Sequence, residues 1–123
     1  MRTPDNILVI RFSSLGDVVL TTPLLRLLRD AFPVARIDML VKSEYADVVR
    51  HHPALSSIIT LGPSSSRDDL RELRARIRTQ RYDVILDLHN SLRSRYVRFL
   101  AARRVRAVDK RVIRRFALVN LKR

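Results

Sequence analysis

The chain has 123 residues, which is long enough for one domain with a buried core. It contains no cysteine, which excludes disulfides and thiolate metal sites, and its apolar runs are too short for a membrane span. The formal net charge is +13, and residues 91–123 hold 12 Lys or Arg against a single Asp. This excess favours an anionic partner, namely phosphate, acidic sugar, anionic lipid or nucleic acid, although it is equally typical of a solvated surface. The N-terminus carries no signal-peptide pattern, so we expect a soluble cytoplasmic protein.

Short β-type runs alternate with helical patterns along the chain. Strands are predicted over residues 7–11, 36–41, 56–61, 82–88 and 105–108. Helices are predicted up to about residue 31 and over residues 43–52, 67–80 and 91–102. Within the first of these helices, Pro23 is expected to restart or kink the helix, with Thr22 as a second cap.

This alternation, with its short connections, predicts an α/β fold. We expect one Rossmann-like domain over residues 1–123, built on a doubly wound parallel sheet with helices on both faces. In the common strand order 3-2-1-4-5, the first and fourth strands flank the crevice that binds ligands. The turns after these two strands, SSLGD and DLHNSLRS, are therefore expected to face each other.

The first of these turns, SSLGD, joins the first strand to the first helix. Ser13 and Ser14 bring hydroxyl and backbone N–H groups to a helix N-terminus, which favours an anionic group there. Gly16 would allow a sharp turn or the close approach of a ligand. Asp17 has two interpretations. It is a helix cap or first-turn acid, which needs no ligand, or it is a catalytic carboxylate that takes a proton from a substrate hydroxyl.

The second turn, DLHNSLRS, follows the fourth strand. His89 is a candidate acid/base group or hydrogen-bond donor, or simply a residue at the entry of the helix. Asn90 and Ser91 are good helix caps. Arg93 and Ser94 fall in the first helical turn, where the helix dipole disfavours an arginine. An arginine at that position is easier to explain if it meets an anion.

Other charged segments are expected to face solvent. His51 and His52 are adjacent at the end of a helix and are predicted to be solvated, so no metal site is expected. The helix over residues 67–80 mixes both signs of charge and is most simply a solvent face. Its basic residues lack interleaved aromatics, which argues against nucleic acid as the partner.

Three segments together resemble a known family. They are ILVIRFSSLGDVVLTTPLLRLLRDAFPVARIDMLV, YDVILDLHNSLRSRYV and VDKRVIRRF, and they resemble the N-terminal half of the ADP-heptose:lipopolysaccharide heptosyltransferases, glycosyltransferase family 9. The resemblance covers essentially the whole chain. It implies a GT-B enzyme of two Rossmann-like domains, whose N-terminal domain receives the lipopolysaccharide inner-core acceptor, of Kdo–lipid A type.

The same resemblance implies how the reaction is divided between the domains. The C-terminal domain binds the donor substrate ADP-heptose, and the transfer is inverting and needs neither metal nor cofactor. Peripheral contact with the inner face of the anionic inner membrane is a further expectation. Because the donor domain is absent from these 123 residues, we expect the isolated chain to be inactive.

The resemblance also implies roles for single residues. Asp17 matches the family aspartate proposed as the general base on the acceptor hydroxyl, and this favours the catalytic interpretation over the cap. Asn90 stands where many relatives have glycine, and no role is assigned to it. The positions that match acceptor-binding residues are Ser13, Ser14, Gly16, Thr22, His89, Arg93, Ser94, Lys110 and Arg114.

Two other functions remain open. The chain could be a non-catalytic module that binds anionic glycolipid or nucleic acid through residues 91–123, in which case binding to any polyanion would be sensitive to salt. It could also be a dehydrogenase fragment. The absence of the glycine-rich dinucleotide pattern argues against this third hypothesis, as does Lys42 where a dehydrogenase has a ribose-binding acid.

Overall fold

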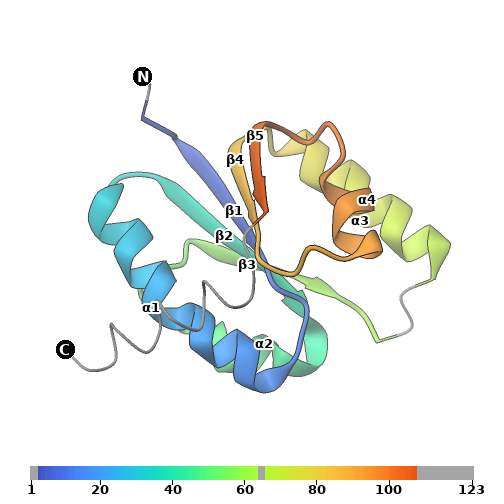
Figure 1. The fold of residues 1–123 in the computed structure, drawn as a ribbon, viewed down its shortest axis with the longest axis horizontal. Helices are drawn as coiled ribbons and strands as arrows, with labels where there is room; N and C mark the ends of the chain where they lie inside the picture. The colour runs from blue at the N-terminus through green and yellow to red at the C-terminus, as the bar shows by residue number, and fades with distance from the viewer. Residues whose placement is uncertain (1–2, 64–65, 108–123) are drawn as a thin grey trace.

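The computed structural model describes residues 3–63 and 66–107. Its centre is a sheet of five parallel strands in the order β3-β2-β1-β4-β5 (Figure 1). The predicted α/β fold and strand order are confirmed, and β1 lies directly beside β4. The strands are β1 (Asn6–Ile10), β2 (Arg36–Lys42), β3 (Ser57–Leu61), β4 (Tyr82–Asp87) and β5 (Ala102–Ala107).

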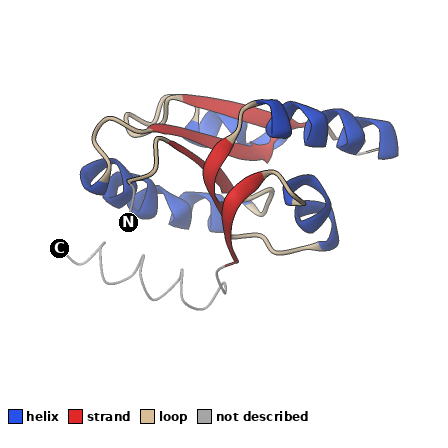
Figure 2. Cartoon of the chain, turned by 90° about the horizontal axis from the view of Figure 1, so that it is seen from above, coloured by secondary structure: helices blue, strands red, loops and turns tan. Residues whose placement is uncertain are grey.

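Helices cover both faces of this sheet (Figure 2). One core lies under α1 (Leu15–Ala31) and α2 (Ala46–Val49), and the other lies under α3 (Arg67–Thr79) and α4 (Leu92–Arg98). The side chains of β1 alternate between them, because Ile7 and Val9 belong to the first core while Leu8 and Ile10 belong to the second. The strand is therefore buried on both faces, which explains its continuous apolar run.

Helix α1 is continuous although Pro23 lies inside it. Proline has no N–H to donate to the carbonyl of Val19, but the Thr22 hydroxyl donates to that same oxygen at 2.8 Å. The Thr21 hydroxyl donates to the carbonyl of Asp17 at 2.9 Å in the same way. The predicted restart of the helix at Pro23, with Thr22 as a cap, is wrong. Thr22 instead supplies a donor that proline lacks.

Two predicted helices are shorter than expected. Residues 43–52 hold only a 3₁₀ turn, η1 (Ser43–Tyr45), and the short helix α2, and α4 ends at Arg98. Leu100 adopts a left-handed backbone with φ of 53°, which a right-handed helix cannot contain. The chain turns there, so β5 begins before the predicted start at Val105. Among the helices that the structure describes, none has the length and apolar character to cross a membrane.

Candidate active site

Arg11, the first residue after β1, connects the two predicted turns. Its Nη1 donates to the Leu88 carbonyl oxygen at 2.6 Å, and its Nη2 lies 2.8 Å from Asp17 Oδ2. The backbone N–H of Leu88 donates to the carbonyl oxygen of Ile10 at 2.9 Å. Arg11 is buried, so these contacts are shielded from water. The turns after β1 and β4 therefore lie side by side, as the strand order predicts.

Asp17 lies in the first turn of α1, and only 10% of its side chain is exposed. The N-cap of the helix is Ser14, so the interpretation of Asp17 as the cap residue is wrong, and it is a first-turn acid. The Ser14 hydroxyl donates to Asp17 Oδ2 at 3.2 Å. A guanidinium, a hydroxyl donor and the positive end of a helix thus all stabilise a negative charge on this carboxylate.

The other residues of the SSLGD turn lie closer to solvent. Ser13 is half-buried, and Ser14 and Gly16 are exposed. Gly16 does not have a left-handed backbone, and a Cβ added to it would meet no atom within 4 Å. The turn itself therefore does not require glycine at this position, so that reason for Gly16 is wrong. The close approach of a ligand stays a prediction.

Phe12 brings two more of the predicted residues to this place. Its ring is fully buried, and its centroid lies 5.0 Å from the centroid of the His89 ring, with the planes tilted by 57°. The guanidinium carbon of Arg93 lies 5.9 Å from the same Phe12 centroid. One aromatic side chain from the β1 turn thus positions both His89 and Arg93 from the β4 turn.

The ring of His89 is half-buried, and its surroundings favour the neutral form. Burial lowers the pKa of His89 below its ordinary value, and the positive charge of Arg11 lowers it further. Its Nδ1 is buried without a hydrogen-bond partner in the described part of the chain. Such an atom costs free energy until water or a ligand hydroxyl pairs with it. A neutral imidazole can donate from one nitrogen and accept at the other, which suits contact with sugar hydroxyls.

Asp87 fixes the shape of the turn after β4. Its Oδ1 accepts from the backbone N–H groups of His89 at 3.1 Å and Asn90 at 2.8 Å, and its Oδ2 lies 2.9 Å from Arg98 Nε. Asn90 has a left-handed backbone with φ of 49°. Glycine and asparagine are the residues that adopt this conformation most readily. The asparagine at this position therefore suits the backbone that the turn requires.

Four other predicted residues either have local hydrogen-bond partners or lie outside the described part of the chain. Ser94 is fully buried and forms a capping box with Ser91, in which each hydroxyl accepts from the other residue's backbone N–H, at 2.7 and 3.2 Å. The hydroxyls of Ser94 and Thr22 both donate to backbone carbonyl oxygens. Contacts of these two residues with a substrate stay predictions. Lys110 and Arg114 lie outside the described residues.

The sequence interpretation missed Arg11 and Phe12, although a signal for the arginine was present. It treats Arg11 only as the end of the first strand. A charged residue directly after a strand that is buried on both faces has to be paired or solvated, and Asp17 is the first acid that follows it. Phe12 gives no comparable signal, since its role depends on which ring the β4 turn brings beside it.

The two adjacent histidines of the sequence have different surroundings. His51 is exposed, as predicted, but His52 is half-buried and its Nδ1 accepts from the backbone N–H of Ala54 at 3.1 Å. Burial lowers the pKa of His52, and the charge of Arg26 lowers it further. The prediction that both rings are solvated is thus wrong for His52. Within residues 3–63 and 66–107, no group of three or more His, Cys, Asp or Glu is placed to hold a metal ion.

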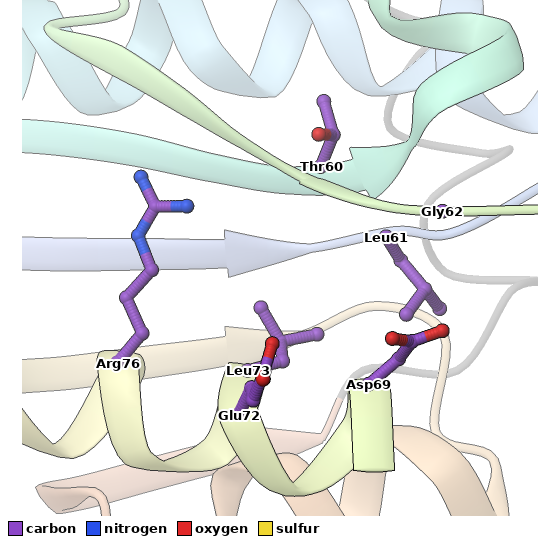
Figure 3. Close-up of a pocket in the computed structure, with 7 residues that line it drawn as sticks. All are labelled: Thr60, Leu61, Gly62, Asp69, Glu72, Leu73 and Arg76. Atoms are coloured by element: carbon purple, nitrogen blue, oxygen red, sulfur yellow. The ribbon is translucent and has the colours of Figure 1, made fainter. Parts of the chain in front are cut away.

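A separate cavity of about 240 Å³ lies at the end of β3 (Figure 3). It is bounded by β3 with the loop after it on one side, and by α3 on the other. None of the predicted site residues lines it. Its lining residues are Thr60, Leu61, Gly62, Asp69, Glu72, Leu73 and Arg76.

Comparison with known proteins gives consistent matches. The structure superimposes on the glycosyl transferase family 9 protein from Veillonella parvula DSM 2008 with a TM-score of 0.80 and 26% sequence identity. The match covers 94% of this chain and 36% of that protein. The sequence is 27% identical over 114 residues to lipopolysaccharide heptosyltransferase 1 of Pseudomonas aeruginosa, covering 85% of this chain and 32% of that relative. In both sequence and fold, this chain therefore resembles part of the heptosyltransferases of glycosyltransferase family 9.

A second curated relative shows the same resemblance. Lipopolysaccharide heptosyltransferase 3 of Escherichia coli K12 is 29% identical over 78 residues, which are 59% of this chain and 23% of the relative. No family profile matches the sequence. The heptosyltransferase-like chain spans about a third or less of the length of these curated relatives, which are glycosyltransferases of lipopolysaccharide biosynthesis.

Proposed function

We propose that this heptosyltransferase-like domain forms the acceptor side of a glycosyltransferase of lipopolysaccharide core biosynthesis. The reaction is the transfer of heptose from ADP-heptose to an inner-core sugar hydroxyl of a Kdo–lipid A acceptor. The observation that supports it most is the placement of Asp17. Arg11 holds this carboxylate beside the turn that carries His89, at the carboxyl edge of β1 and β4, where parallel sheets bind their ligands.

In this proposal, Asp17 is the general base. As the acceptor oxygen bonds to the anomeric carbon from the face opposite the leaving group, its proton passes to the carboxylate of Asp17. The bond from the anomeric carbon to the diphosphate oxygen breaks, and ADP takes the electron pair, so the configuration inverts. Arg11 keeps the carboxylate oriented and charged before the transfer, which is the state that a base needs.

The other residues of the two turns would bind the acceptor. Arg93 offers a guanidinium for the carboxylate of an acidic core sugar, since no ion pair occupies it among the described residues. His89, held in its neutral form, would exchange hydrogen bonds with sugar hydroxyls. The donor would be held by a second domain outside these 123 residues, as in the two-domain enzymes that the chain resembles.

The test is the variant Asp17→Asn in a two-domain chain that carries these residues as its N-terminal half. Asparagine keeps an oxygen for Arg11 but cannot take the proton, so kcat should fall by about 10²–10⁴-fold. The affinity for the acceptor should change little. Asp30→Asn makes the same chemical change at an exposed position of the same helix and should leave kcat unaltered.

Two outcomes would contradict this assignment. Turnover near the normal rate in Asp17→Asn, with its urea midpoint close to that of the parent, would remove the base role. Salt-sensitive binding of every polyanion, with no preference for the lipopolysaccharide core, would favour the non-catalytic binding module instead.

A further inference from the structure

The charges of α3 are segregated along its two edges. Arg67, Arg71, Arg74 and Arg78 are spaced at i, i+4, i+7 and i+11, which places them in one stripe of a helix. Asp69, Glu72 and Arg76 instead line the cavity on the side of β3 (Figure 3). The helix carries both signs of charge on its solvent-exposed side, as expected, but the two signs are not evenly mixed. One of its edges is purely basic.

Helix α4 places an apolar stripe beside these arginines. Leu92, Tyr96 and Phe99 are spaced at i, i+4 and i+7, and Leu100 follows directly. The guanidinium carbon of Arg74 lies 4.8 Å from the Tyr96 ring centroid and 5.3 Å from that of Phe99. Arg78 donates from Nη2 to the Phe99 carbonyl oxygen at 2.9 Å. Figure 1 shows the two helices side by side on one face of the sheet.

The apolar residues of this surface are unusually open to solvent. Leu92 is 83% exposed, Phe99 56% and Leu100 78%. Among the described residues, none of the four α3 arginines forms an ion pair with an acid. We name the surface formed by Arg67, Arg71, Arg74, Arg78, Leu92, Tyr96, Phe99 and Leu100 the α3–α4 face.

We propose that the α3–α4 face docks on an anionic lipid bilayer. Arginines that form no ion pair with an acid attract anionic headgroups, while tyrosine, phenylalanine and leucine side chains insert at the level where headgroups meet acyl chains. A nucleic acid would explain the arginines and the rings, but not two exposed leucines. This assignment of a surface goes beyond the proposed function and does not depend on it.

The test measures binding of the 123-residue chain to vesicles by co-sedimentation at low salt. Vesicles of phosphatidylcholine mixed with phosphatidylglycerol should bind the chain, and vesicles of phosphatidylcholine alone should not. Each arginine near an anionic surface contributes about fivefold to binding, so Arg67→Gln with Arg71→Gln should weaken it by about 25-fold. Arg26→Gln with Arg50→Gln removes the same formal charge from the other side of the sheet, at α1 and at the residue after α2, and should change binding little.

A second pair of variants tests the apolar part of the surface. Leu92→Gln with Leu100→Asn removes exposed side chains that fill no core, and asparagine tolerates the left-handed backbone at position 100. Binding to the anionic vesicles should fall by about tenfold or more, while the urea midpoint is kept.

Three results would overturn the proposal. The first is equal binding to both kinds of vesicle. The second is unchanged binding to the anionic vesicles after Arg67→Gln with Arg71→Gln. The third is binding of single-stranded RNA in preference to the anionic vesicles, with no effect of Leu92→Gln and Leu100→Asn on binding. The vesicles contain neither sugar donor nor sugar acceptor. Failure here therefore leaves the proposed transfer reaction untouched, and the reverse also holds.

Discussion

The guanidinium of Arg11 and the carboxylate of Asp17 form an ion pair at 2.8 Å, with side chains only 7% and 10% exposed. The same guanidinium donates to the Leu88 carbonyl oxygen, so one side chain joins the end of β1, the start of α1 and the turn after β4. Burying this pair gives little net stability, but leaving one partner without the other is costly. The pair therefore enforces a relative position of the two turns.

Substitution Arg11→Met should lower the free energy of unfolding by about 3 kcal/mol. Methionine fills much of the same space, but it removes the guanidinium that lies 2.8 Å from the buried carboxylate of Asp17 and the donor to the Leu88 carbonyl. Urea denaturation at neutral pH measures the change. In the double variant Arg11→Met with Asp17→Asn, the loss should be smaller than the sum of the two single losses. Additive losses would mean that the two side chains do not interact in solution.

The Thr22 hydroxyl should stabilise the helix only because Pro23 follows it. Thr22→Val removes the donor to the Val19 carbonyl and should cost about 1 kcal/mol, while Thr22→Ser keeps it. Pro23→Ala restores a backbone N–H for the same carbonyl, so Thr22→Val in that background should cost much less. Urea midpoints of Thr22→Val, Thr22→Ser, Pro23→Ala and the double variant Thr22→Val with Pro23→Ala measure these costs. If Thr22→Val costs the same in both backgrounds, the hydroxyl does not act by replacing the donor that Pro23 lacks.

Much of the fold follows from the sequence, while the details of the site do not. Alternating apolar runs and helical patterns predict a parallel sheet, and the strand order brings the SSLGD and DLHNSLRS turns together, as found. The bridge through Arg11 and the stacking of Phe12 on His89 were not predicted, because they depend on which side chains meet across two strands. The end of α4 was also missed, since the left-handed backbone of Leu100 carries no signal in a leucine.

The left-handed backbone at position 90 predicts which side chains the β4 turn accepts. Asn90→Gly should change the free energy of unfolding by only a few tenths of a kcal/mol, because glycine adopts this conformation without strain. Asn90→Ala should lose about 1 kcal/mol, since a Cβ without a polar group is disfavoured there. Thermal or urea unfolding of the two variants compares them directly. Equal stabilities would show that residue 90 leaves the left-handed region in solution.

The buried rings of His89 and His52 predict a loss of stability in mild acid. Burial comes first among the causes that lower both pKa values, and neighbouring arginines act in the same direction. Below about pH 6.5, the unfolded chain therefore takes up protons that the folded chain does not, so stability falls as the pH falls. Between about pH 7.5 and 5.5, each of the two rings can remove at most about 1.4 kcal/mol.

Urea midpoints at these two pH values test the assignment ring by ring. His89→Gln and His52→Gln should each reduce the acid-dependent loss, and the double variant should reduce it most. His51→Gln, which changes an exposed ring next to His52, is the matched control and should keep the full loss. Adding an acceptor that pairs with His89 Nδ1 should change the pH dependence of the parent chain but not that of His89→Gln. An acid-dependent loss that is equal in the parent and the double variant would mean that both rings take up protons in the folded chain as readily as in the unfolded one.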